Sequence, residues 1–199
     1  EAIHVEQKRI KESVGSQDQV AAAFGGLNKI TFGGPNRIMV QPITISFGRI
    51  NELQSHCLLF FTGLSRNAAE IAAVQIKNTP NKKTELVKMH AMVDQAIDIL
   101  SGGHDLREFG LLLHESWMLK RGLSDLITNA HIDRAYGAAR RAGAVGGKLL
   151  GAGGGGFILI FTGPKKHSAV RNAMKGLLEI PFQFEHLGSQ IIYHGLHES

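Results

Sequence analysis

The sequence predicts an α+β fold, and three features along the chain point to it. Short apolar runs typical of strands dominate residues 27–62, and long stretches with helical spacing occupy residues 65–142. A β–α–β pattern then follows from residue 146. Strands and helices that are segregated along a chain are typical of α+β architectures in two parts. With 199 residues, the chain is long enough for one large or two small domains.

The first third should contain two short helices and three strands. Apolar positions among charges predict a helix over residues 1–13, which Gly15-Ser16 ends. An alanine-rich helix is expected over 18–24, stopped by Gly25-Gly26. Strands are predicted at 27–32 and 37–45, joined by a turn at 33–36, and at 56–62.

The remainder should be mainly helical. Helices are predicted at 65–77, 84–100, 105–119 and 129–142. A glycine-rich hairpin follows, then a helix near 165–176 and strands near 181–185 and 190–193.

Composition narrows the class of protein. The net charge of +5 is mild and suits a small anionic substrate, and we find no basic stripe with interleaved aromatic residues, so no nucleic-acid partner is expected. No apolar run approaches the roughly 18 residues of a membrane helix, so no membrane partner is expected either. The single cysteine, Cys57, fits a reducing compartment, and we expect a cytoplasmic location with Cys57 as a small apolar residue of a strand.

A run of glycines before the strand at 157–161 is the most informative motif. Gly151, Gly153 and Gly156 satisfy G-x-G-x-x-G, but a strand follows instead of the helix that dinucleotide binding requires. The Walker A pattern fails because positions 142 and 149 are Ala and Leu. Two interpretations remain: a flexible connection between strands, or a loop whose free N–H groups meet a phosphate or another close neighbour.

Three further groups are candidates for chemistry. Asp18 follows a glycine break, and it either caps a helix or accepts a hydroxyl proton in phosphoryl transfer. Residues 62–66 form either an anion site with Arg66 or a simple helix start. Lys148 could meet a phosphate or lie at a strand edge. His114-Glu115 begins H-E-x-x-H but position 118 is Met, so no metal site is predicted.

These motifs together resemble a known superfamily. The segment KLLGAGGGG at 148–156 is similar to the third signature motif of the GHMP kinases, and residues 15–26 resemble the helix of that family that carries its Asp. The segment FFTGLSR at 60–66 resembles the sugar-1-kinase branch, in particular the heptose 7-phosphate kinases. The similarity runs along essentially all of the chain.

The resemblance implies a two-domain fold and an assignment of roles. Residues 1–62 would be the remainder of a ribosomal S5 domain 2-like N-terminal domain, and residues 63–199 a ferredoxin-like C-terminal domain. Asp18 would be the catalytic base. Arg66, Gln17, Gly25 and Gly26 would bind substrate. The loop near the ATP phosphates would comprise Lys148, Gly151, Ala152, Gly153, Gly154, Gly155 and Gly156.

The resemblance also implies the reaction. An ATP-dependent kinase would phosphorylate the anomeric hydroxyl of a heptose 7-phosphate, with ATP and Mg²⁺ as cofactors and the sugar phosphate as its small-molecule partner. Whether the protein forms a homodimer stays open. The family's Pro-x-x-x-Gly-Leu-x-Ser-Ser phosphate loop is not found in the sequence, so we expect an N-terminal part with the Mg²⁺ ligands to be missing. The alternatives are a fucokinase- or galactokinase-like enzyme and a non-catalytic sugar-phosphate-binding fragment.

Overall fold

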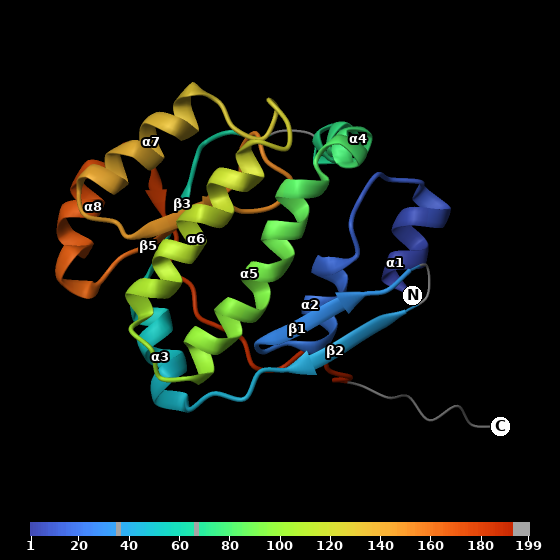
Figure 1. The fold of residues 1–199 in the computed structure, drawn as a ribbon, viewed down its shortest axis with the longest axis horizontal. Coiled ribbons are helices and arrows are strands. Elements are labelled where there is room, and N and C mark those ends of the chain that lie inside the picture. The colour runs from blue at the N-terminus through green and yellow to red at the C-terminus, as the bar shows by residue number, and fades with distance from the viewer. Residues whose placement is uncertain (35–36, 66–67, 193–199) are drawn as a thin grey trace.

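Two antiparallel sheets organise the computed structural model, which describes residues 1–34, 37–65 and 68–192 (Figure 1). The small sheet pairs β1 (Asn28–Phe32) with β2 (Ile38–Pro42). The large sheet has the order β4-β5-β3-β6, made of β4 (Gly146–Leu149), β5 (Phe157–Phe161), β3 (Cys57–Phe61) and β6 (Leu178–Glu179). The predicted α+β character is therefore confirmed.

Helices make up most of the rest of the described chain. The N-terminal ones are α1 (Ala2–His4), a π-helical turn η1 (Val5–Ile10), α2 (Gln17–Phe24) and α3 (Phe47–Ser55). The central ones are α4 (Ala68–Asn78), η2 (Thr79–Asn81), α5 (Lys83–Ser101), α6 (Leu106–Arg121) and α7 (Ala130–Arg141). Near the C-terminus lie η3 (Pro164–Lys166) and α8 (His167–Ala173). Helices predicted at these places are confirmed, with shifted ends.

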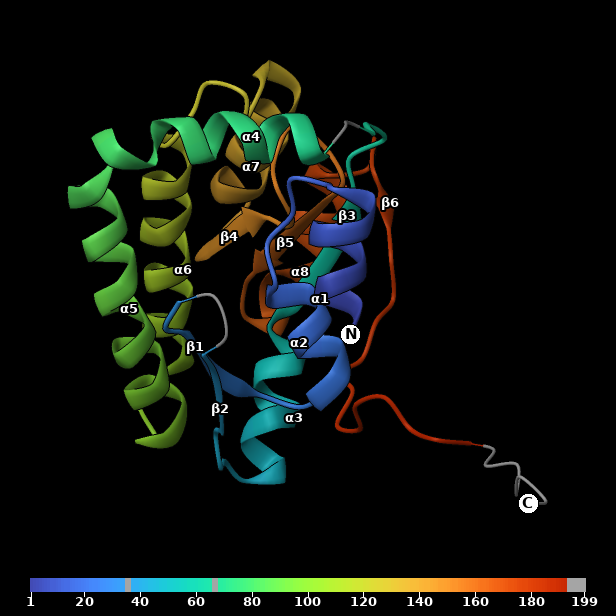
Figure 2. The ribbon, with the colours of Figure 1, turned by 90° about the vertical axis from the view of Figure 1, so that its right-hand side faces the viewer.

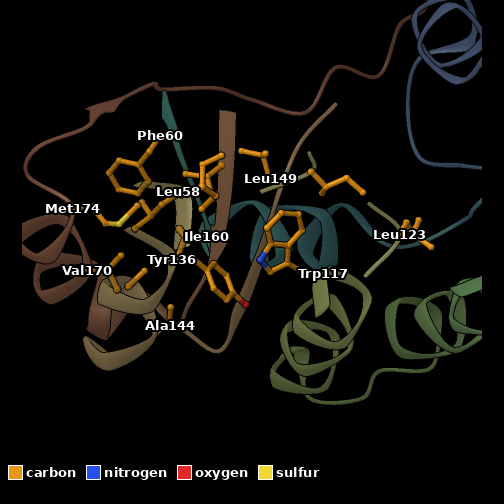
Figure 3. Close-up of a cluster of buried hydrophobic side chains, with 14 residues drawn as sticks. Leu58, Phe60, Trp117, Leu123, Tyr136, Ala144, Leu149, Ile160, Val170 and Met174 are labelled. Atoms are coloured by element: carbon orange, nitrogen blue, oxygen red, sulfur yellow. The ribbon is translucent and has the colours of Figure 1, made fainter. Parts of the chain in front are cut away.

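The core lies between the large sheet and the helices α7 and α8. Leu58, Phe60, Ile158 and Ile160 alternate along β3 and β5, so they share one face of the sheet, and all four are buried. Figure 3 shows Leu58, Phe60 and Ile160 with Trp117 of α6, whose side chain is fully buried. In Figure 1, α5 and α6 run side by side between this sheet and the β1–β2 hairpin. Figure 2 shows α4 crossing above α5, α6 and α7.

The helix α3 was not predicted from the sequence. It is short and contains Gly48, a poor helix former, although Phe47, Ile50 and Leu53 follow helical spacing. The Ser46 side chain accepts a hydrogen bond from the N–H of Arg49, which caps the helix start. The Arg49 guanidinium then donates to main-chain oxygens of Ile99, Leu100 and His104, so tertiary contacts fix the helix between β2 and β3.

The strands predicted at 181–185 and 190–193 are wrong within the described residues. β6 ends at Glu179, and residues 180–192 form no strand. The side chain of Gln54 replaces a neighbouring strand there: its Nε2 donates to the oxygen of Phe182, and its Oε1 accepts from the N–H of Phe184. The backbone is thus satisfied by one amide side chain, which an apolar pattern cannot indicate.

The C-terminal segment continues from Phe184 onto the end of α2. The N–H of Gly26 donates to the oxygen of Glu185, and the N–H of Ser189 donates to the oxygen of Ala23. A Cβ at Gly188 would lie 2.0 Å from that same Ala23 oxygen, so only glycine fits the contact. Within the described chain, no helix is long and apolar enough to cross a membrane.

Candidate functional site

Asp18 lies in the first turn of α2, and its side chain is exposed. The N-cap is Ser16, so the capping interpretation of Asp18 is wrong. Among the residues described, nothing forms a hydrogen bond or ion pair with the Asp18 carboxylate. The helix start is fixed from outside, because Gln7 Nε2 donates to Ser16 Oγ and Gln19 Nε2 donates to the Glu6 carboxylate. Asp18 therefore sits on a positioned helix with its carboxylate available.

The glycine loop between β4 and β5 is packed against other parts of the main chain. Gly151, Gly153, Gly154 and Gly156 have φ values of 70°, 129°, 72° and 91°, which L side chains rarely adopt. A Cβ at Gly153 would lie 2.8 Å from Cα of Ile127. The glycines thus allow both positive φ and close approach, and the prediction of a strand–loop–strand unit is confirmed.

Four neighbours hold the loop in place. The N–H of Gly154 donates to the oxygen of Ile127, and the N–H of Gly156 donates to the oxygen of Leu64. Side-chain amides reach the loop from two helices: Gln75 of α4 donates to the oxygen of Ala152 at 2.6 Å, and Asn129 at the start of α7 donates to the oxygen of Gly154 at 3.1 Å. A loop held on this many sides is not a flexible connection.

Part of the loop keeps its hydrogen-bond donors free. Within residues 1–34, 37–65 and 68–192, no group accepts a hydrogen bond from the N–H of Gly151, Ala152, Gly153 or Gly155. Gly151 is exposed, and a Cβ added there would meet nothing within 4 Å. Gly153 and Gly155 are buried, so this group of donors is open at Gly151 and the half-buried Ala152. Free N–H groups beside open space are a typical binding site for an anion.

Lys120, in the last turn of α6, connects this loop to Asp18. Its Nζ donates to the oxygen of Gly151 at 2.5 Å. Burial lowers the pKa of Lys120 to about 8, with repulsion from Lys148 adding to the fall and attraction to Asp18 opposing it. Asp18 therefore lies within electrostatic reach of an ammonium that contacts the glycine loop. Lys120 was not among the predicted site residues, because basic residues are common at the C-terminal ends of helices and carry no signal of a site.

Lys148 is the second lysine of the site. It lies on β4 opposite Leu159, and burial lowers the pKa of its ammonium. Its ammonium has no hydrogen bond or ion pair with any residue that the structure describes. Lys148 is thus half-buried without a partner. Lys148 therefore lies on an edge strand of the large sheet, as β4 is outermost, but it is not fully solvated.

The other predicted site residues have different surroundings. Gly25 has φ 61°, and a Cβ there would lie 2.4 Å from the N atom of Gly188, so the C-terminal segment explains this glycine. Gly26 contacts the same segment, whereas Gln17 is exposed with no described partner. Their role in substrate binding stays a prediction. Arg66 lies outside the described residues.

The segment after β3 supports the glycine loop. Thr62 is buried, and its Oγ1 donates to the oxygen of Gly156 at 2.8 Å. Leu64 lies against Gly155, where a Cβ would be 2.6 Å from the Leu64 oxygen. The described part of residues 62–66 therefore packs on the loop, and its anion-binding role stays a prediction.

A separate apolar cavity of about 270 Å³ lies between the β1–β2 hairpin and the helices α5 and α6. Met89, Met92 and Leu113 are among its lining residues, and none of the predicted site residues lines it. Among the described residues, no group of three or more His, Cys, Asp or Glu side chains is arranged to hold a metal ion. The free main-chain N–H groups and the lysine ammoniums are donors of the kind that bind an anion.

Known proteins match this chain over most of its length. The family profile "GHMP kinases C terminal" matches residues 84–179. The chain is 32% identical to D-glycero-alpha-D-manno-heptose 7-phosphate kinase of Campylobacter jejuni, over 87% of this chain and 52% of that protein. It is 28% identical to the bifunctional fucokinase/GDP-fucose pyrophosphorylase of Arabidopsis thaliana, over 74% of this chain and 14% of that protein.

A solved structure matches the fold as well. The crystal structure of a D-glycero-D-manno-heptose 1-phosphate kinase from Bacteroides thetaiotaomicron superposes with a TM-score of 0.65 at 27% identity. The match covers 96% of this chain and 54% of that one. The chain thus spans about half the length of the heptose kinases that it matches.

Proposed function

The chain belongs to the GHMP kinase family, and from this premise we propose that it forms part of an ATP-dependent sugar kinase acting on the anomeric hydroxyl of a heptose 7-phosphate. The substrate class rests on the similarity to heptose kinases, which extends over most of this chain. The observation that carries the chemistry is the position of Lys120. Its ammonium donates a hydrogen bond to the glycine loop, and attraction to the Asp18 carboxylate acts to raise its pKa.

In this proposal Asp18 accepts or orients the proton of the C1 hydroxyl. Its carboxylate is exposed, has no described partner and lies on a helix fixed at both ends. The free N–H groups of the glycine loop and the two lysines supply positive charge where phosphate oxygens gather. Phosphoryl transfer depends mainly on such positioning and electrostatic stabilisation. The described residues include no group of three or more His, Cys, Asp or Glu side chains that could hold Mg²⁺.

The activity belongs to the whole protein. The chain spans about half the length of its relatives. We therefore propose the ATP site and the substrate site for the complete kinase and not for this chain alone. We also propose the division into residues 1–62 and 63–199. β3, which holds residues 57–61, pairs with β5 in the large sheet. The two proposed parts are therefore hydrogen-bonded to each other through this pair of strands.

Two alternatives have an observation behind them. Similarity to a plant fucokinase supports a kinase for an unphosphorylated sugar. The free N–H groups of the glycine loop would equally suit a non-catalytic module that binds a sugar phosphate. A panel of sugars separates the two kinases, and ATP titration of the longest polypeptide that contains this chain separates a kinase from a binding module.

The decisive experiment replaces Asp18 by Asn. We expect kcat with ATP and heptose 7-phosphate to fall by about 10² to 10⁴, with little change in the KM for ATP. Asp98→Asn is the matched control, since Asp98 is an exposed carboxylate on α5 that makes no described side-chain contact. ADP release is measured for both variants. Near-normal turnover of the Asp18 variant would remove this residue from the mechanism.

A further inference from the structure

The end of α2 that lies away from Asp18 is bound by the C-terminal segment. Along α2, Val20 is buried, whereas residues 21–24 are exposed. The oxygen of Ala23 accepts a hydrogen bond from the N–H of Ser189 at 3.1 Å, and the N–H of Gly26 donates to the oxygen of Glu185 at 2.9 Å. Figure 2 shows the segment running from β6 down to this end of α2. A helix with so exposed a surface depends on such contacts for its position.

The fit between α2 and this segment excludes side chains on both partners. Gly25 has φ 61°, and a Cβ there would overlap the N atom of Gly188. A Cβ at Gly188 would in turn overlap the oxygen of Ala23. Main chain therefore lies directly on main chain at two glycines, and this close packing defines how the segment and the helix fit together.

The segment has a defined shape where it reaches α2. The Glu185 carboxylate accepts hydrogen bonds from the N–H of His186 at 2.8 Å and from the N–H of Leu187 at 2.9 Å, which closes a turn. These two bonds lower the pKa of Glu185, so the carboxylate that closes the turn is charged at neutral pH. The turn places Gly188 against the end of α2.

Gln54, near the end of α3, anchors the segment to the body of the protein. Its Nε2 donates to the oxygen of Phe182 at 3.2 Å, and its Oε1 accepts from the N–H of Phe184 at 2.9 Å. The Phe184 side chain packs against the buried cluster that contains Leu53 and Phe161. The segment is therefore attached to the core before it reaches α2.

The first turn of α2 has a different support. Gln7 donates to Ser16, and Gln19 donates to Glu6. Residues 1–10, all of which the structure describes, contain no buried side chain. Of these two supports, the segment after β6 is the one that ties α2 to the core of the large sheet, from which the glycine loop also extends.

We propose that residues 182–189 form a strap that sets the position of α2 relative to the large sheet, and that Gln54 is a positioning residue for the Asp18 carboxylate through this strap. The role of Asp18 rests on the proposed function. Ala23 and Asp18 are about 7.5 Å apart along the helix axis, at about 1.5 Å per residue, so a tilt of α2 at the strap moves the carboxylate. Misplacing a catalytic group by about 1 Å can lower the rate about 10²-fold.

Hydrogen exchange tests the strap without an assay of activity. In the longest polypeptide that contains this chain, Gly188→Ala should push the strap away from α2 and speed exchange of the amides of residues 21–26 about tenfold. Gly176→Ala is the matched control, since Gly176 is exposed after α8 and a Cβ there would meet nothing within 4 Å. Mass spectrometry of the corresponding peptides follows both variants. Unchanged exchange in α2, or an equal increase in the control, would overturn the proposal.

Gln54→Ala reaches the strap from its other end. It removes both hydrogen bonds to the strap without adding bulk, and it should speed exchange of residues 21–26 while β5 stays protected. Asp105→Ala is the control, because it removes a side-chain hydrogen bond, the cap of α6, that does not involve the strap. Faster exchange of α2 in the Asp105 variant alone would refute the role of Gln54.

Turnover separates positioning from a general loss of stability. Gln54→Ala should lower kcat about tenfold with the KM for ATP unchanged, and Asp105→Ala should leave kcat unchanged. When Gln54→Ala is added to Asp18→Asn, kcat should fall no further, because the effect of Gln54 passes through Asp18. An equal fall in both backgrounds would refute the positioning role. Normal turnover of Asp18→Asn would instead refute the proposed function, and exchange of α2 would still decide whether the strap holds the helix.

Discussion

The main chain of Gly153 lies directly on the main chain of Ile127, so that a Cβ at position 153 would sit 2.8 Å from the Cα and 2.9 Å from the oxygen of Ile127. The connection between α6 and α7 thus shapes the glycine loop as closely as the strands that flank it. This contact explains why the loop needs glycine even where no ligand is bound.

Replacing Gly153 by Ala should therefore destabilise the chain strongly. The φ of 129° and the contact with Ile127 both oppose a side chain, and we expect the free energy of unfolding to fall by about 3 kcal/mol. Gly151→Ala is the matched control, because open space surrounds that position and only the positive φ is unfavourable, at about 1 kcal/mol. Urea denaturation measures both. Equal losses would mean that the contact does not matter.

Asn129 should combine two separable roles. Its Oδ1 accepts hydrogen bonds from the N–H groups of His131 and Ile132, and its Nδ2 donates to the oxygen of Gly154. Asn129→Asp keeps the cap and loses only the bond to the loop, at about 1 kcal/mol, whereas Asn129→Ala loses both, at about 2 kcal/mol. Thermal unfolding checks the order. An Asp variant as unstable as the Ala variant would argue that the loop bond dominates.

Lys120 should titrate near pH 8 in the free chain, well below the usual value of 10.5. Lys148→Met should raise this pKa by removing a like charge, although burial keeps it below 10.5. Asp18→Asn should lower it, since the carboxylate favours the ammonium. Lysine ε-carbon NMR follows each shift. The two substitutions should shift the Lys120 pKa in opposite directions. Shifts in the same direction would mean that Lys148 or Asp18 does not lie near Lys120.

The same lowered pKa makes stability depend on pH. Between about pH 8 and pH 10.5 the unfolded chain binds more protons at this lysine than the folded chain, so the free energy of unfolding should rise with pH over that window. Lys120→Met should lack this contribution. Chemical denaturation of both proteins at several pH values measures the difference, and parallel curves would count against the burial of this ammonium.

Cys57 should resist thiol reagents while the chain is folded. Burial raises the pKa of its thiol to about 12, and its Sγ lies 3.4 Å from the oxygen of Leu53, so almost no thiolate exists at pH 8. Reaction with a chromogenic disulfide should be slow in buffer and rapid in urea. The absence of any other cysteine makes the signal unambiguous. Rapid reaction of the native chain would indicate local opening around β3.

The elements defined by local pattern could be predicted from the sequence. Short continuous apolar runs revealed β3 and β5, helical spacing revealed α5 and α6, and Gly25 marked the end of α2. The elements that escaped depend on distant partners. Arg49 fixes α3 through main-chain oxygens in the last turn of α5, and the side chain of Gln54 takes the place of a strand next to residues 182–184. Neither relationship leaves a periodic signal.

The candidate site divides in the same way. The glycines of the loop and Asp18 were accessible because unusual composition and the family resemblance both drew attention to them. Lys120 could not be identified in this way, because its importance depends on the contact between α6 and the loop after β4, which the sequence does not reveal. The role of Gly25 in substrate binding stays a prediction, and the structure adds that Gly188 of the C-terminal segment lies against this position, which the sequence did not indicate.

The pairing of β3 with β5 has a consequence for biosynthesis. β3 cannot join its central partner until the ribosome has produced helices α4 to α7 and the glycine loop, and β6 comes later still. An apolar strand that waits so long for both neighbours is exposed to wrong partners in the meantime. Slow folding is therefore the expected behaviour of this chain, and substitutions that destabilise the glycine loop should reduce the yield of soluble protein as well as the free energy of unfolding.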